Sequence, residues 1–251
     1  QLKNNKGLHF FAGSGVPIPV LSKYVNNRGY SGTEGLFGIP GSVGGGIYMN
    51  ASSFEDSLTK YIHKIVSIDT NNNIIITKRG DANFSWRFSK FHNNKNLIIG
   101  AYFYFPKNKI SNKKLLENKL QKHLETRKKL QEKEYPNLGS LFATKNIYSD
   151  LKFISPTFLA LYILNKLINL IFFKNFFNKY LFRMRVFVNS LYLKKLNLDY
   201  NSNFTLSEKT INCLVNKGSE KSIEGIDLIK QFQKKTKNKI RLENIILDKI
   251  L

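Results

Sequence analysis

The sequence has a single cysteine, and this scarcity excludes several kinds of site. Cys213, alone among 251 residues, cannot form an internal disulfide framework or a cysteine-based metal cluster. The histidines do not have a metal-ligand spacing such as HxxxH; they are His9, His63, His92 and His123. We therefore predict no metal site, and we expect a reducing, cytoplasmic setting.

Acidic residues are also few. The chain has 17 Asp and Glu against 40 Lys and Arg, which gives a net charge of +23, and most of the excess lies in residues 106–251. Such a field attracts phosphates, nucleic acid or an anionic membrane surface. A drift of composition toward Lys, Asn and Ile, which leaves solvated lysines on the surface, explains the charge at least as well. Because no recognition helix or RNA-binding motif accompanies it, we predict no specific nucleic-acid partner.

A recognisable leader and an uninterrupted apolar span are both missing. The opening QLKNNKGLHFF has neither a basic segment before an apolar run nor a small-residue cleavage site. Residues 156–173 are near the lower limit of about 17 to 25 residues for a membrane span, but Asn165, Lys166 and Asn169 interrupt them. We expect a helix packed on the domain, and the alternative is a peripheral membrane contact through residues 156–185.

The residue patterns predict an α+β protein. In the first hundred residues we expect strands at 9–13, 47–51, 64–70, 73–79 and 96–106, a hairpin joining the third and fourth, and a helix over 18–28. Beyond them we expect a charged helix at 111–134, a loop at 135–146 and a helix starting at Ser155-Pro156. A strand at 211–216, a helix capped by Ser222 and a strand at 240–247 end the chain.

The most informative segment is glycine-rich. Five glycines crowd nine residues around Ile39-Pro40, at positions Gly38, Gly41, Gly44, Gly45 and Gly46. Glycines permit positive φ and a close approach of backbone N–H groups to a ligand, which is how a loop can cradle a phosphate. A structural turn needs only one or two, so we favour a phosphate-binding loop. The segment has neither the GxGxxG pattern nor the Walker lysine.

This segment resembles a known family. Glu34-Gly35-Leu36, the run GIPGSVGG at 38–45 and MNA at 49–51 are similar to the EGLxGIPG[ST]VGG and MNA motifs of UDP-N-acetylenolpyruvoylglucosamine reductases. The resemblance implies a PCMH/vanillyl-alcohol-oxidase-like FAD-binding α+β region at residues 1–105. It also implies a smaller α+β substrate-binding lobe at 106–251, here with a helical apolar insert at about 151–195. The implied FAD-binding residues are Gly38, Ile39, Pro40, Gly41, Ser42, Gly44, Gly45, Asn50 and Ala51.

Three further segments match family motifs in the family's order. FSWRFSKF at 84–91 resembles GYRxSxF, QEKEYPNLGSLF at 131–142 resembles QPLEYPSAGSVF, and SEKTINCLVNKG at 207–218 resembles SEKHANFIVNxG. The implied reaction is reduction of FAD by NADPH, then hydride transfer to UDP-N-acetylglucosamine enolpyruvate, a UDP-sugar. Ser140 would donate the proton and Arg87 would face the substrate carboxylate. Arg127 and Glu243 are the implied substrate-binding residues.

The sequence also departs from the family pattern. The family's terminal strand reads VxLExEVR, and Ile245 replaces its second glutamate while Glu243 matches the first. The lysine that follows Gly-Ser-x-Phe in the family is displaced to Lys145. An alternative function is therefore a catalytically impaired homologue that acts as a flavin-binding or membrane-surface module. The sequence specifies no oligomeric state.

Overall fold

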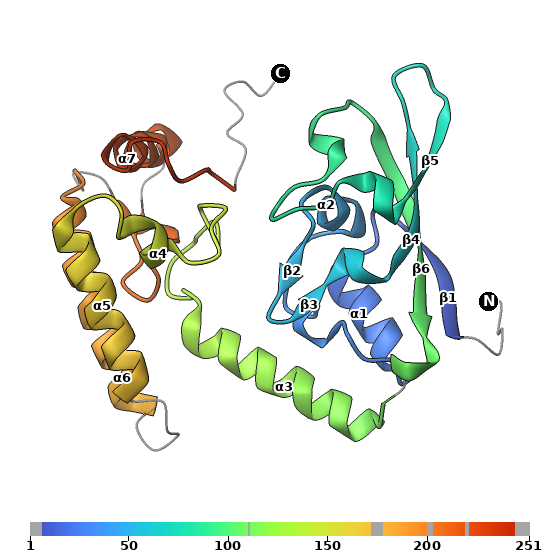
Figure 1. Ribbon diagram of the computed structural model, residues 1–251, viewed down its shortest axis with the longest axis horizontal. Coiled ribbons are helices and arrows are strands. Elements are labelled where there is room, and N and C mark those ends of the chain that lie inside the picture. Colours follow the sequence, from blue (N-terminus) through green and yellow to red (C-terminus); the bar gives the residue numbers. More distant parts are fainter. Residues whose placement is uncertain (1–6, 110, 172–177, 200–202, 219–220, 244–251) are drawn as a thin grey trace. The chain divides into compact units, whose positions relative to one another are not determined.

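A computed structural model describes residues 7–109, 111–171, 178–199, 203–218 and 221–243 (Figure 1). The chain forms two compact units, Gln1–Lys129 and Leu130–Leu251. This division falls after Lys129, whereas we expected it at residue 105, because the helix α3 (Lys113–Leu130), except for its last residue, groups with the first unit. The assignment of cofactor to one unit and substrate to the other stays a prediction.

The first unit is built on a four-stranded sheet. Its strands β1 (Gly7–Gly13), β4 (Ile62–Ile68), β5 (Ile74–Lys78) and β6 (Leu97–Pro106) pair antiparallel in the order β1-β6-β4-β5. The predicted hairpin is confirmed, since Ile68 pairs with Ile74 across it. Asp69 closes the turn by accepting hydrogen bonds from the N–H groups of Asn71 and Asn73, each at 2.9 Å.

Helices cover one face of this sheet. The helix α1 (Ile18–Asn26) begins with Pro19 in its first turn, as predicted, and α2 (Val43–Tyr48) follows the glycine-rich segment. Short strands β2 (Ser52–Ser53) and β3 (Asp56–Ser57) and 3-10 helices connect the larger elements; the 3-10 helices are η1 (Glu34–Leu36), η2 (Leu58–Tyr61), η3 (Arg79–Ala82), η4 (Lys90–His92) and η5 (Lys107–Lys109). The core joins apolar residues of α1 and α2 to the inner side chains of β4 and β6.

The strand predicted at 47–51 is wrong. Ile47 and Tyr48 end α2, and a turn follows. Val43 and Ile47, four residues apart, are both fully buried, so the apolar spacing is that of a helix. Ser42 caps this helix, because its Oγ accepts the N–H of Gly45 at 3.3 Å.

The second unit is mainly helical. It contains α4 (Ile147–Leu151), α5 (Pro156–Ile171), α6 (Asn178–Leu196), the antiparallel pair β7 (Phe204–Leu206) and β8 (Leu214–Asn216), and α7 (Ser222–Lys235). The helices α5 and α6 pack on each other, and α7 packs on β7 (Figure 1). No helix among the described residues is long and apolar enough to cross a membrane.

Three predictions about this unit need correction. Ser222 is the first residue of α7 and does not cap it; Lys221 holds the cap position without a side-chain cap bond. The strand predicted at 211–216 is confined to β8. Within 240–243 there is only an isolated bridge between Leu242 and Phe142, and the rest of the predicted terminal strand, with Ile245, lies outside the described residues.

Candidate functional site

Backbone hydrogen bonds fix the glycine-rich segment against the end of β1. The N–H groups of Val43 and Gly44 donate to the carbonyls of Val16 and Ser14, both at 2.8 Å, and Gly41 O accepts from Ile18 N at 2.9 Å. Two N–H groups that could have served a phosphate are therefore already bound within the protein. These hydrogen bonds hold the backbone of the glycine-rich segment in place where it leads into α2.

Three of the five glycines are explained by packing. A Cβ on Gly38 would lie 2.6 Å from Arg127 Cδ, one on Gly44 would lie 2.8 Å from Ser14 Cβ, and one on Gly46 would lie 2.4 Å from Leu58 Cδ2. Gly41 and Gly45 differ. A Cβ on Gly41, whose φ is +136°, would meet no atom within 4 Å, and a Cβ on Gly45 would meet only Ser42 Oγ, at 3.7 Å. These two positions leave exposed backbone that a ligand can approach.

The segment after α2 holds the loop that contains Arg87. Asn50, with a φ of +45°, accepts a hydrogen bond from the Thr59 hydroxyl at 2.5 Å and donates to the carbonyl of Ser85 at 2.6 Å. Ser89 Oγ donates to the carbonyl of Tyr48 at 2.7 Å. Ala51, the last residue of MNA, is buried. The MNA motif therefore ties the glycine-rich segment to the segment around Arg87.

Arg87 lies beside the end of the MNA motif. Its Nη1 donates to Ser52 Oγ at 3.2 Å and to Ser52 O at 3.4 Å, and its guanidinium lies 5.0 Å from the centre of the Trp86 ring. The backbone of Arg87 has a φ of +52°, a conformation that non-glycine residues rarely adopt. The structure thus brings together two motifs that are 35 residues apart in the sequence.

Arg127 also reaches the glycine-rich region, from α3. Its Nη2 donates to Gly35 O at 3.0 Å and to Ser53 Oγ, and its guanidinium lies 5.3 Å from the centre of the Phe54 ring. Burial lowers the pKa of Arg127. The Arg127 side chain also occupies the space where a Cβ on Gly38 would lie. Arg127 therefore holds the segment 35–54 against α3.

Two buried acids were missing from the candidate residues. The Glu34 side chain is fully buried, and its Oε2 accepts the N–H groups of Gly32 at 2.7 Å and Thr33 at 2.9 Å. Asp56 Oδ2 accepts Gly35 N at 2.7 Å, and burial raises its pKa. The sequence signal was the acid in EGL, and the structure shows that it shapes the turn before the glycine-rich segment.

The second unit holds the other two candidates. Segments 141–143 and 241–243 pair, since Glu243 N donates to Leu141 O at 2.9 Å and Ala143 N donates to Arg241 O at 2.8 Å. Ser140 is exposed directly before the buried Leu141, so Ser140 and Glu243 lie in adjacent segments. Gly139, with a φ of +68°, provides the turn.

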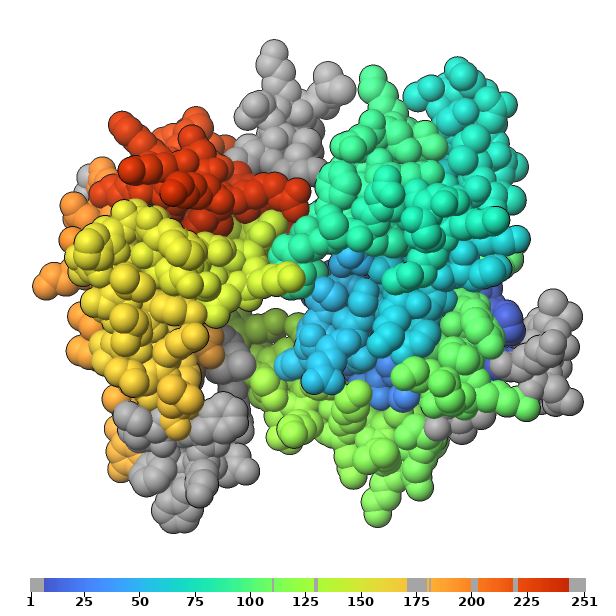
Figure 2. Space-filling view, in the orientation of Figure 1, coloured from blue at the N-terminus to red at the C-terminus, as the bar shows by residue number. Residues whose placement is uncertain are grey.

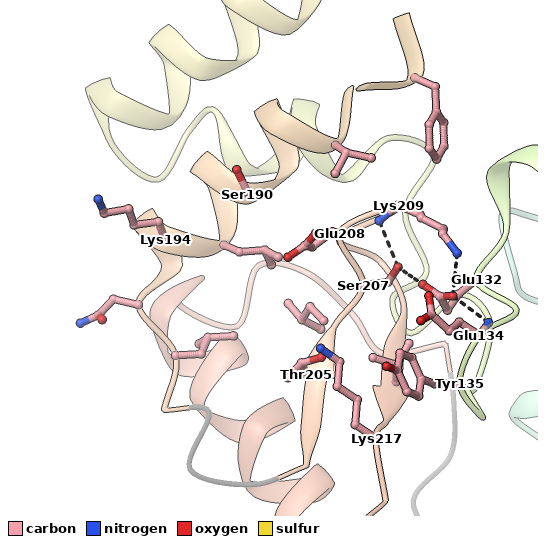
Figure 3. Close-up of a pocket in the computed structure, with 17 residues that line it drawn as sticks. Glu132, Glu134, Tyr135, Ser190, Lys194, Thr205, Ser207, Glu208, Lys209 and Lys217 are labelled. Carbon is pink, nitrogen blue, oxygen red and sulfur yellow. Dashed lines mark hydrogen bonds and ion pairs between the residues drawn. The ribbon is translucent and has the colours of Figure 1, made fainter. Parts of the chain in front are cut away.

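A cavity of about 770 Å³ lies between α6, the β7–β8 pair and residues 132–135 (Figure 3). Ser207 Oγ and Lys209 Nζ of the SEK motif bind the Glu132 carboxylate at 2.8 and 3.0 Å. Burial alone raises the pKa of Glu132, but these bonds and the N–H groups of Glu134 and Lys133 lower it to about 2. The SEK motif therefore fastens residues 132–135 to the start of the β7–β8 loop.

Comparison with known proteins supports the resemblance seen in these motifs. The chain is 38% identical over 110 residues to UDP-N-acetylenolpyruvoylglucosamine reductase of Chlamydia felis, covering 43% of this chain and 37% of that protein. It is 39% identical over 131 residues to the Prochlorococcus marinus protein of the same name, covering 51% of this chain and 43% of that one. The chain thus covers less than half the length of either relative. No family model matches it.

The fold is similar to that of a solved structure. UDP-N-acetylenolpyruvylglucosamine reductase (MurB) from Thermus caldophilus superposes with a TM-score of 0.63 at 19% identity, covering 93% of this chain and 71% of that one. The predicted α+β class is confirmed. This chain is therefore similar in sequence to UDP-N-acetylenolpyruvoylglucosamine reductases and has their fold.

Proposed function

We propose that this protein is a flavoenzyme that uses NADPH to reduce UDP-N-acetylglucosamine enolpyruvate to UDP-N-acetylmuramate, in the cytoplasm, during peptidoglycan precursor synthesis. The similarity to reductases of that name supports this proposal. The observation that carries it is the Arg87 guanidinium beside the MNA motif, because this connects the glycine-rich segment to a fixed positive charge.

The exposed part of the glycine-rich segment fits a flavin nucleotide. Gly41 and Gly45 leave their backbone open to a bulky ligand, and Ser42 lies between them at the start of α2. Bound FAD would supply the relay that takes a hydride from NADPH and passes it to the enolpyruvyl group. In this proposal Gly38, Ile39 and Pro40 shape the loop, while Asn50 and Ala51 fix its far end through protein contacts.

The side chains supply charge and a proton. Arg87 is permanently charged and planar, so it can pair with the substrate carboxylate and with the negative charge that develops during reduction. We assign Ser140 as the proton donor, and a serine hydroxyl needs a strongly basic carbon close by to do this. Glu243 is the acid nearest in sequence to the position that Ile245 fills, so we assign it to the substrate site beside Ser140.

Two roles are open for Arg127. The sequence predicts a substrate-binding residue, whereas its contacts with Gly35, Ser53 and Phe54 support a positioning role in which it holds the glycine-rich segment. The substrate role stays a prediction. Substituting Arg127 separates the two: loss of a positioning residue weakens FAD binding, and loss of a substrate ligand raises KM alone.

The proposal is tested by adding FAD to the purified chain and following the flavin absorption bands. We expect saturable binding and bleaching of the bands by NADPH. A chain that binds no FAD under native conditions contradicts the proposal. A chain that binds FAD but is inert toward the UDP-sugar supports the impaired flavin-binding homologue instead.

A peripheral membrane contact through residues 156–185 is a separate part of our proposal about partners. It depends on the surface of α5 and on none of the residues assigned to the reaction. Its failure would leave the reductase proposal unchanged.

A further inference from the structure

The helix α5 exposes a row of apolar side chains. Leu159, Ile163, Leu167 and Leu170 are 45%, 49%, 49% and 69% exposed, and their spacing of four, four and three residues places them on one face. We call these residues the α5 row. In the space-filling view, the yellow surface of α5 is uncovered on the side shown (Figure 2).

The other face of α5 packs into the second unit. Phe158 and Ile168 are 5% and 6% exposed and belong to the core that includes Tyr192 and Phe232. The helix is thus held by one apolar face and presents a second one to solvent. A contiguous exposed apolar surface of this kind marks a contact with a partner or a membrane.

Lysines lie along the border of the α5 row. Lys166 is between Ile163 and Leu167 in the sequence, and its Nζ lies 5.2 Å from the centre of the Tyr162 ring. Lys152 Nζ lies 4.8 Å from the centre of the same ring. Two ammonium groups and a phenol therefore flank the apolar side chains, as on helices that lie in a membrane interface.

The charge of residues 152–198 favours an anionic membrane over a second copy of the chain as the partner of the α5 row. Residues 152–198 contain no Asp or Glu, and they contain Lys152, Lys166, Lys174, Lys179, Arg183, Arg185, Lys194 and Lys195. A second copy docked through the α5 row would bring Lys152 and Lys166 near their own counterparts, with no acid in the segment to offset them, and this opposes pairing through this face. An anionic lipid surface has the complementary charge and accepts both the apolar row and the lysines.

We propose that the α5 row docks on an anionic membrane surface. Its leucines and isoleucine enter the boundary between headgroups and acyl chains, and Lys152 and Lys166 face the lipid phosphates. The proposal rests on the second unit alone and is independent of flavin chemistry.

The apolar part of the proposal is tested by co-sedimentation of the full chain with vesicles of phosphatidylglycerol and phosphatidylcholine. We expect the I163Q/L167Q variant to bind about tenfold more weakly or worse, since two apolar side chains that would enter the membrane are lost. The matched control is I74Q/L97Q, which changes two exposed apolar residues of β5 and β6 and should bind as the unmodified chain does. Equal losses in the two variants overturn the proposal.

The charged part is tested with K166E against K78E, an equal change of net charge at an exposed residue of β5. One cation near an anionic surface contributes about 1 kcal/mol, so K166E should weaken binding at least about fivefold and K78E much less. Equal effects would mean that net charge alone attracts the chain, and undiminished binding to pure phosphatidylcholine would remove the need for anionic lipid. Sedimentation velocity without vesicles should show monomers; a dimer that I163Q/L167Q dissociates would identify a second copy as the occupant instead.

Discussion

At the scale of single residues, the absence of a side chain at Gly38 leaves the space that the Arg127 side chain occupies. A Cβ on Gly38 would lie 2.6 Å from Arg127 Cδ, so the Arg127 side chain would have to shift, although Gly35 O and Ser53 Oγ hold it through hydrogen bonds. The two residues are 89 positions apart, so neither spacing nor propensity in the sequence predicts the contact. It was the resemblance that marked both residues, and only the structure relates them.

We predict that G38A destabilises the first unit by about 1 to 3 kcal/mol, because the added methyl group must displace Arg127. Trp86 is the only tryptophan and lies in this unit, so its fluorescence reports unfolding by denaturant. G80A is the control, since a Cβ on Gly80 meets no atom within 4 Å. Equal unfolding midpoints for G38A and G80A would contradict the inference that the Arg127 side chain must move when Gly38 gains a Cβ.

Glu132 gives a prediction about pH. Its pKa is lowered from 4.5 to about 2 in the folded chain, so its contribution to stability is complete above pH 4.5 and is lost as the pH falls toward 2. E132Q should therefore cost the second unit about 2 kcal/mol at pH 7 and much less near pH 2. Reaction of the single, buried Cys213 with dithiodipyridine, which proceeds at acid pH, reports opening of this unit. A cost that does not change with pH would show that the carboxylate charge is not what matters.

At the scale of elements, the sequence predicts what local patterns determine. The strands of the sheet, the hairpin at Asp69 and the helices α1, α3 and α5 follow from periodicity and turn residues. The short helix α2 was mistaken for a strand, because IYMNA is rich in residues that favour strands while burial of Val43 and Ile47 at helical spacing decides the outcome. At Ser222 the hydroxyl residue that should cap α7 begins it instead. Motifs in the sequence mark Arg87 and Ser140, whose roles stay predictions. The EGL motif includes Glu34 but does not indicate its backbone contacts, and no motif includes Asp56.

The cap of α2 yields a test with two readouts. S42A should lower the stability of the first unit by about 1 kcal/mol, whereas S42D should keep the cap. If the flavin phosphates lie against the exposed backbone of Gly41 and Gly45, S42D should nonetheless weaken FAD binding about tenfold or more through like-charge repulsion. Stability is read from Trp86 fluorescence and affinity from a flavin titration. Unchanged FAD affinity in S42D would exclude this loop as the phosphate site.

At the scale of the whole molecule, the chain carries one reporter for each unit. Trp86 lies in the first unit and Cys213 in the second. Units with separate cores can unfold separately. We expect G38A to shift the transition seen by Trp86 and leave the Cys213 transition in place, with the opposite result for E132Q. Coincident shifts in both variants would show that the two units unfold as one.

The most direct test of the proposed reaction is the rate at which the enolpyruvyl UDP-sugar reoxidises flavin that NADPH has reduced on this protein. We expect substrate-dependent return of the flavin absorption in the unmodified chain, a loss of at least about a hundredfold in S140A and in R87A, and little change in S190A, a serine of α6. Flavin that binds and is reduced by NADPH but is not reoxidised by the substrate would contradict the account. So would reoxidation that is as fast in S140A and R87A as in the unmodified chain.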